Sequence, residues 1–153
     1  MQVRQLMSRD VVTLEAKTTL DIADDIMTLK RIRHLPVLEN EVLVGLVTQR
    51  DLFRAGLSSI LEFRKHAVKE WLAQIQVREV MVENLVTIGP DAPVEDAVAL
   101  MVDRKIGCLP VVAENKLVGM LSETDCLRYL KRILEIADVK RRVVEEEAVV
   151  DMA

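Results

Sequence analysis

The sequence LVGLVTQRD at residues 43–51 recurs as LVGMLSETD at residues 117–125. In both stretches an apolar run contains one glycine, a hydroxyl residue follows the run, and an aspartate comes three residues after the hydroxyl residue. The apolar run predicts a buried strand, and the hydroxyl residue with its acidic partner predicts the start of a helix. The chain therefore uses the same strand-to-helix junction twice, 74 residues apart.

Repetition extends well beyond these two junctions. When the chain is aligned on itself at a spacing of 74 residues, 15 of the 51 positions from 3 to 53 are identical and no gap is needed. A Leu-Pro-Val triplet, for example, stands at residues 35–37 and again at residues 109–111. Self-similarity at a fixed period indicates one supersecondary unit that is used twice.

Each unit is predicted to have the element order β-α-β-β-α. Short apolar runs predict the strands, and apolar residues spaced three and four apart predict the helices. In the second unit Pro93 suits the first position of a helix. The expected strands are residues 11–14, 35–38 and 42–47 in the first unit and 85–88, 109–113 and 117–121 in the second, and the expected helices begin near Thr18, Thr48, Ala92 and Ser122.

These elements predict an α/β (α+β) fold of two tandem β-α-β-β-α repeats, at residues 1–56 and 77–135. A helical linker is expected at residues 57–76 and a helical tail at residues 136–153. The helix that leads into the tail is indicated by an apolar stripe between Leu127 and Ala137. After Glu145 the helical signal weakens, and we expect the chain to fray there.

Composition excludes several classes of protein. Half of the 153 residues are hydrophobic but only four are aromatic, so the core must be aliphatic. The net charge of −4 gives no overall basic field for nucleic acid. Since no apolar run approaches the ~18 residues of a membrane span, no membrane association is expected. With no signal-peptide core at the N-terminus, a cytoplasmic protein is the default expectation.

The sequence also lacks the usual marks of an enzyme or a metal site. Cys108 and Cys126 have no metal-type spacing, and neither His34 nor His66 forms a cluster with them. We expect two small buried thiols without a disulfide. No nucleophile–base pair and no glycine-rich phosphate loop is evident. We therefore expect no catalytic activity, no metal and no required cofactor.

Two interpretations of the repeated junction remain open. In the first, Thr48 and Ser122 cap the following helices, and Asp51 and Asp125 complete a capping box at the third helical position. In the second, the same groups bind a ligand. A helix N-terminus with a hydroxyl can hold a phosphate, and a nearby carboxylate can accept hydrogen bonds from the hydroxyls of a ribose.

The two junctions, each preceded by a hairpin that contains a hydrophobic-Pro-Val motif, resemble the CBS domain. Its signature is glycine, a hydrophobic residue, any residue, Thr or Ser, two further residues and Asp, and both copies match it. The resemblance covers roughly residues 1 to 135. It implies a pair of repeats related by a pseudo-two-fold axis, with two clefts that bind adenosine compounds such as AMP, ADP, ATP or S-adenosylmethionine. It also implies that Thr48 and Ser122 contact phosphate and that Asp51 and Asp125 contact ribose.

The same resemblance places the base of the ligand against the first strands and the residues around the hairpin prolines. It does not settle which copy lends its first strand to which cleft. The residues concerned are Thr13, Arg33, His34, Leu35 and Pro36 in the first copy and Thr87, Gly107, Cys108, Leu109 and Pro110 in the second.

The two copies differ in charge around the motif. Arg33 and Arg50 flank the first motif, whereas glycine and threonine stand at the equivalent positions of the second. The nearest cations of the second copy are Arg104 and Lys105. We therefore expect the cleft with Asp51 to prefer a phosphate ligand, and the other cleft to be empty, weaker or suited to a less anionic adenosine compound.

The preferred hypothesis is a regulatory module that binds an adenine nucleotide and acts on an unknown effector protein. The alternatives are a structural or dimerisation module with empty clefts and a binder of S-adenosylmethionine or NAD. The order of elements also resembles stand-alone bacterial CBS proteins of the acetoin-utilisation type. CBS pairs commonly associate, so a homodimer is expected, with helix faces near Met27 and Met101 or at Leu57, Ile60 and Leu61 as candidate contacts.

Overall fold

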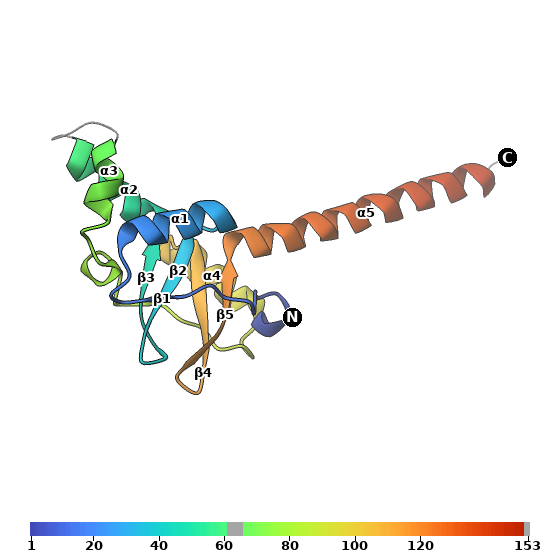
Figure 1. Ribbon diagram of the computed structural model, residues 1–153. Coiled ribbons are helices and arrows are strands. Elements are labelled where there is room, and N and C mark those ends of the chain that lie inside the picture. The colour runs from blue at the N-terminus through green and yellow to red at the C-terminus, as the bar shows by residue number, and fades with distance from the viewer. Residues whose placement is uncertain (61–65, 152–153) are drawn as a thin grey trace.

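The computed structural model describes residues 1–60 and 66–151. Each half contains a helix, a β-hairpin and a second helix, as Figure 1 shows. The two halves are the two copies of the sequence repeat, and their hairpins contact each other through β3 and β5. The elements of the first half are a 3-10 helix (η1, Val3–Gln5), β1 (Leu14–Glu15), α1 (Leu20–Lys30), β2 (His34–Glu39), β3 (Val42–Thr48) and α2 (Gln49–Ile60). Those that follow are α3 (His66–Leu72), a second 3-10 helix (η2, Val77–Glu79), α4 (Val94–Arg104), β4 (Cys108–Ala113), β5 (Lys116–Ser122) and α5 (Glu123–Asp151).

Both hairpins have the same register and the same turn. β2 pairs antiparallel with β3 and β4 with β5, and each pair has one irregularity at the equivalent position. The two central turn residues have positive φ in both hairpins, 49° and 65° at Asn40 and Glu41 and 49° and 61° at Glu114 and Asn115. Positive φ at both positions is typical of the type I′ turns that match the twist of paired strands. The hairpins are thus formed where the apolar runs predict them.

The first helix of each half covers its hairpin with a small apolar face. On α1 the buried residues Leu20, Ala23 and Met27 are spaced three and four apart, and α4 buries the equivalent positions, including Met101. Met27 and Met101 are only 2% and 5% exposed, so the prediction that they lie on a face open to a second molecule is wrong. In the second half Pro93 is the N-cap of α4, one residue before the expected position, because its ψ of 142° is still extended.

The segments that begin the two repeats are exchanged between the halves. Val3 is fully buried in the core of the second half, and Val77 is fully buried in the core of the first half. Backbone hydrogen bonds hold both segments in place. The Val3 N–H donates to the Ala92 carbonyl at 2.9 Å, and the Val77 N–H donates to the Thr18 carbonyl at 2.7 Å. Each half therefore completes its core with the first residues of the other copy.

The exchanged segments also pair with the opposite hairpins, and the expected first strands that follow them are short. Ser8 forms an antiparallel bridge with Met120 of β5, and Val82 forms one with Leu46 of β3, so these segments pair with the opposite hairpin. The predicted strand at residues 11–14 is reduced to β1, which pairs in parallel with β2. Of the predicted strand at residues 85–88, Ile88 alone makes a bridge, to Val111 of β4. The apolar pattern indicated strands near these segments. It could not show that the segments pair with the hairpin of the other half.

The glycines of the repeated junction make room for the exchanged segments. A Cβ atom on Gly119 would lie 2.6 Å from the Met7 Sδ and 3.0 Å from the Ser8 carbonyl oxygen. A Cβ on Gly45 would lie 2.8 Å from the Met81 Cγ. Both distances to the methionines are shorter than real Cβ contacts. The glycine of each hairpin is thus required by the methionine that crosses over it.

The linker and the tail are helical. Leu72 of α3 is buried in the core of the first half, and the Lys69 Nζ lies 3.3 Å from the Asp25 Oδ1 on α1. Leu61, which the linker prediction includes, lies outside the described residues. The tail is the continuation of α5, which leaves the body as one helix and reaches Asp151 (Figure 1). The expected fraying after Glu145 is therefore not observed in the described residues.

In the residues that the structure describes, no helix combines the length and apolarity that crossing a membrane would require.

We predict that Gly119→Ala lowers the free energy of unfolding by about 1–3 kcal/mol, the usual cost of adding a methyl group to a packed site. The added methyl group would collide with the Met7 side chain, which is flexible, and would press on the Ser8 carbonyl, which cannot move away without disturbing the exchanged segment. Urea denaturation monitored by circular dichroism measures the change.

Gly89→Ala is the matched control, since nothing lies within 4 Å of a Cβ built at Gly89. We expect that variant to unfold within about 1 kcal/mol of the wild type, because its main effect is on the unfolded chain. Equal stability of the two variants would show that the glycine of the junction is not constrained by the crossing methionine.

Candidate functional site

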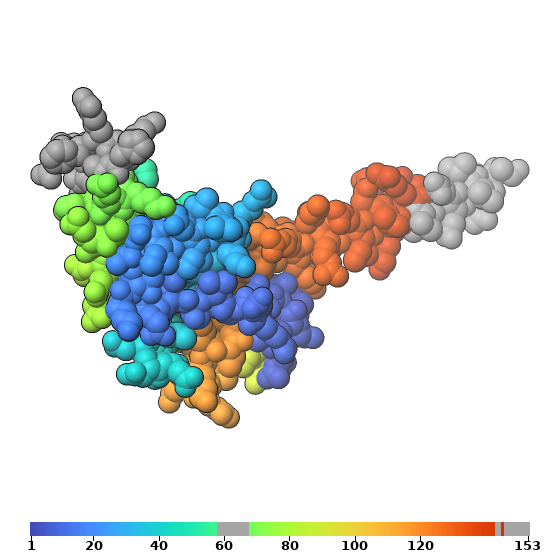
Figure 2. All heavy atoms as spheres, viewed as in Figure 1, coloured from blue at the N-terminus to red at the C-terminus, as the bar shows by residue number. Residues whose placement is uncertain are grey.

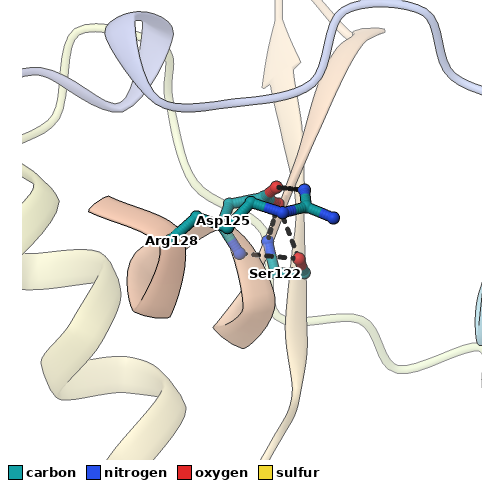
Figure 3. Close-up of polar contacts among 3 residues, drawn as sticks. All are labelled: Ser122, Asp125 and Arg128. Carbon is teal, nitrogen blue, oxygen red and sulfur yellow. Dashed lines mark hydrogen bonds and ion pairs between the residues drawn. The ribbon is translucent and has the colours of Figure 1, made fainter. Parts of the chain in front are cut away.

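Each repeated junction forms a complete capping box at the start of a helix. In the first copy the Thr48 N–H and the Thr48 hydroxyl both donate to the Asp51 Oδ2, at 2.8 and 2.7 Å. The Asp51 N–H donates in return to the Thr48 Oγ1 at 3.3 Å. Ser122 and Asp125 repeat this arrangement at the start of α5, with distances of 2.9, 2.6 and 3.3 Å (Figure 3). The capping interpretation of the motif is therefore correct in both copies.

The second oxygen of each aspartate distinguishes the two copies. The Asp125 Oδ1 accepts a hydrogen bond from the Arg128 Nη1 at 3.4 Å, as Figure 3 shows. Arg54 stands at the equivalent position of the first copy, but no hydrogen bond or ion pair to the Asp51 Oδ1 is found among the described residues. In the described residues the Asp51 Oδ1 thus has no hydrogen-bond partner, whereas the Asp125 Oδ1 has one long contact with the largely exposed Arg128.

A cavity of about 720 Å³ lies beside Thr48 and Asp51, between the two halves. The size is within the range of small-molecule sites. Its walls come from both copies, because the segment from Val82 to Val86 passes over the hairpin that carries Thr48. The second copy therefore lends its first segment to the cleft with Asp51. Eight of the predicted site residues line this cavity: Arg33, His34, Thr48, Arg50, Asp51, Gly107, Cys108 and Pro110.

The other five predicted site residues lie elsewhere. Thr13 is exposed and lines a smaller cavity of about 250 Å³ near the hairpin turns. Pro36 is fully buried in β2, and Thr87 is exposed next to the cleft-lining Val86. Ser122 and Asp125 line neither of the two cavities, although they form the same capping box as their counterparts. The structure thus places the first motif at the cavity of about 720 Å³, while the second motif lines neither of the two cavities described.

The charges that line the large cavity are predominantly positive. Four cations, Arg33, Arg50, Arg54 and Lys105, face two carboxylates, Asp51 and Glu123, which leaves a net charge of +2 with His34 neutral. The whole chain carries −4, so positive charge is concentrated at this site. Lys105 was expected beside the second motif, but it lines the cavity of the first motif. A basic cavity inside an acidic protein favours an anionic ligand.

His34 of the first copy and Glu123 of the second both line the cleft and both lie next to Gly107. A Cβ on Gly107 would lie 3.4 Å from the Glu123 Oε2 and 3.5 Å from the His34 Nε2, so the absence of a side chain at Gly107 leaves room for both groups. Burial and the neighbouring Arg33 lower the pKa of His34, and the carboxylates of Glu123 and Asp51 act in the opposite direction. The His34 imidazole is therefore uncharged at pH 7 and lines the cleft as a neutral group.

The two thiols are free and differ in their surroundings. Cys108 is buried beside the cleft, and burial together with the Glu123 carboxylate raises its pKa to about 12. Cys126 is partly buried against the second core, where burial and the nearby Asp125 raise its pKa as well. A thiol with a raised pKa is a poor nucleophile.

In the part of the chain that the structure describes, no group of three or more metal-ligating side chains is found.

Three charged residues of this cleft, Arg54, Lys105 and Glu123, were not predicted to line it. Arg54 lies one position beyond the end of the alignment that defines the repeat, and its identity with Arg128 at the same spacing was a usable signal. Lys105 and Glu123 belong to the second copy, yet they line the cleft of the first motif. Nothing in the sequence indicates that contribution, since it depends on how the two halves face each other.

Comparison with known proteins identifies the repeated unit. The family model described as "CBS domain" matches residues 3–58 and again residues 77–132. Among curated proteins, a CBS domain-containing protein of Dictyostelium discoideum is 37% identical over 135 residues, which cover 87% of this chain and 93% of that protein. The two matched ranges coincide with the two halves that face each other across the cleft.

Solved structures show the same architecture. A putative acetoin utilization protein (AcuB) from Vibrio cholerae superposes with a TM-score of 0.75 and 33% identity, over 90% of this chain and 96% of that one. The CBS domain pair of protein MJ0100 superposes with a TM-score of 0.70 at 22% identity, over 86% of this chain and 96% of that one, which shows a shared fold. The sequence repeat, the capping-box motif and these matches establish that the chain belongs to the CBS domain family.

Proposed function

We propose that the chain is a regulatory module that binds one adenosine nucleotide, in the cleft beside Asp51, and responds by changing its interaction with an effector protein. The observation that carries this proposal is the composition of the cleft. A free carboxylate oxygen, a helix N-terminus and four cations line a single cavity, which is built from both halves. The module needs no catalytic group for this task.

The cleft offers a complementary group for each part of a nucleotide. The Asp51 Oδ1 can accept hydrogen bonds from the ribose hydroxyls. Arg50, Arg54 and Lys105 provide charge for phosphate groups, and the start of α2 adds the positive end of its dipole. The apolar side chains of Leu85, Val86 and Ile106 provide a surface for a flat base. AMP, ADP and ATP all contain these three parts.

A related structure supports the choice of an adenosine compound. The CBS domain pair of protein MJ0100 was solved in complex with 5′-methylthioadenosine and S-adenosyl-L-methionine. Neither of those compounds carries a phosphate group. The four cations of the present cleft therefore favour a phosphorylated ligand over S-adenosylmethionine, while NAD, which is also phosphorylated, remains a ligand to be tested.

A purely structural role is the second candidate, and one observation favours it. Both motifs form complete capping boxes, so the repeated Thr/Ser-x-x-Asp pattern has a function without any ligand. In that case the clefts would stay empty and the module would serve association alone. The unequal charges around the two motifs are not explained by capping, because Thr48 and Ser122 cap their helices in the same way.

Regulation follows from the position of the cleft between the two halves. A ligand that contacts both Arg54 of the first copy and Lys105 of the second adds contacts across their junction. Such a ligand shifts the conformation only if it binds the two states with different affinity. We propose that a cytoplasmic effector protein reads this shift, and that two copies of the chain associate.

We predict that an adenosine nucleotide raises the melting temperature of the wild type and that Asp51→Asn removes most of this shift. At 100 times the dissociation constant, a ligand of the folded state contributes about 2.7 kcal/mol of stability. The variant loses the charged acceptor for the ribose hydroxyls. Thermal denaturation with AMP, ADP, ATP, NAD and S-adenosylmethionine measures the shift and identifies the ligand.

Asp125→Asn is the matched control, since Asp125 has the same capping role and lines neither cavity. Both substitutions should lower the melting temperature without ligand by a similar amount. Only Asp51→Asn should reduce the ligand-induced shift. If no compound stabilises the wild type, or if the two variants respond equally, the structural role is favoured instead.

We also predict that Lys105→Gln weakens the binding of ATP by about 10- to 150-fold, the loss expected for one charge-assisted hydrogen bond. The binding of adenosine, which has no phosphate, should not change. Calorimetric titration compares the two ligands. Arg104→Gln removes the same charge from an adjacent exposed position that does not line the cavity, and it should leave ATP binding intact. Equal losses in the two variants would contradict a phosphate contact by Lys105.

A further inference from the structure

His34 stands beside the capping box of the first junction. It lies directly opposite Thr48 in the register of β2 and β3, and opposite residues of two paired strands point their side chains to the same side of the sheet. Both residues line the cleft with Asp51, whose carboxylate accepts a hydrogen bond from the Thr48 hydroxyl. A phosphate held at the start of α2 would therefore lie next to the half-buried His34 ring.

Charged groups from several elements line the cleft together with the His34 ring. Arg33 directly precedes it in the chain, and Glu123 is the first residue of α5, which then extends away from the body (Figure 2). The other charged groups are those of α2 and of the residue that ends α4: Arg50, Asp51, Arg54 and Lys105. The ring therefore lies among groups of both signs, with cations in the majority.

Without a ligand, the neutral form of His34 prevails. Burial and Arg33 hold the pKa of His34 below its ordinary value of 6.5, although Glu123 and Asp51 act in the opposite direction. A bound phosphate would bring further negative charge to the same side of the ring. Negative charge beside an imidazole stabilises its protonated form. The pKa of His34 should therefore rise when a phosphorylated ligand binds.

The second copy has no equivalent titrating group. Cys108 stands at the position of His34 and lies opposite Ser122 in the register of β4 and β5. Its pKa of about 12 keeps the thiol uncharged near neutral pH. A response to pH of the kind inferred for His34 therefore belongs to the junction with Asp51 and adds to the differences between the two copies.

We propose that His34 takes up one proton from the solvent when a phosphorylated ligand enters the cleft, so that the module binds its nucleotide more tightly as the pH falls. The proton goes to the ring nitrogen that carries no hydrogen, and no covalent bond to the ligand forms. The inference rests on the proposed nucleotide site and adds a second signal, pH, to which that site responds.

The direction of the effect follows from linkage between protons and ligand. Above the His34 pKa of the bound chain, the ring is neutral in both states and the affinity does not depend on it. Between that pKa and the lower pKa of the free chain, binding takes up a proton. In this window each unit of pH lowers the dissociation constant by at most about tenfold, the limit for one coupled proton.

Proton NMR of the imidazole groups tests the proposal directly, since the chain contains two histidines. In a His66→Gln variant the remaining imidazole resonances belong to His34. With saturating ATP they should titrate at a higher pH than without ligand. Saturating adenosine, which has no phosphate, should leave the midpoint nearly unchanged. An unchanged midpoint in the ATP-saturated chain, or an equal rise with adenosine, would overturn the proposal and leave the nucleotide site itself intact.

Calorimetric titration with ATP from about pH 8 to about pH 6, in buffers of different ionisation enthalpy, counts the protons taken up. The terminal phosphate of ATP also gains a proton in this range, so the wild type is compared with His34→Gln, which shares that contribution. The wild type should take up more protons, and its dissociation constant should fall more steeply with pH. Equal proton uptake in the two proteins would contradict the role of His34. Absence of ATP binding at every pH would overturn the proposed nucleotide site together with this inference.

Discussion

The crossing of Met7 over Gly119, and of Met81 over Gly45, is the contact on which the architecture depends. Each methionine belongs to a segment that completes the core of the opposite half, where Val3 and Val77 are fully buried. Neither half can therefore complete its core alone. This reciprocal packing fixes the two hairpins relative to each other, and the cleft between them is a direct consequence. The glycine of the family motif is explained by packing before any ligand is considered.

The two repeats provide two equivalent strand-to-helix junctions, but the side chains around the two junctions differ. Both positions retain a capping box, which the start of a helix requires. The first position has Arg33 and Arg50, and Lys105 of the other copy also lines its cleft. At the second position, Arg128 makes a long contact with the aspartate oxygen whose counterpart has no hydrogen-bond partner in the described residues. Capping of the helix start accounts for what the two copies share, and the proposed nucleotide site accounts for how they differ.

Local sequence patterns were sufficient for the elements whose contacts are local. The hairpins, the helices α1 and α4 and both capping boxes agree with periodicity and with the spacing of Thr48 and Asp51. The first strands lie where they were predicted but are short, at β1 and at the Ile88 bridge. The pairing of Ser8 and Val82 with the opposite hairpins was not predicted, because no short-range pattern reveals it. Lys105 was assigned to the wrong cleft for the same reason. The length of α5 was underestimated, because charged residues weaken an apolar pattern, whereas the pair of Arg141 with Asp138 stabilises a helix.

The central claim is that one nucleotide binds per chain, at the junction of the two halves beside Asp51. Titration calorimetry of the full chain with ATP, followed by the same titration at several salt concentrations, tests it most directly. The account predicts a stoichiometry of one ligand per chain and an affinity that falls as salt screens the four cations of the cleft. Binding of two equivalent ligands per chain, or no binding of any adenosine nucleotide, would contradict it.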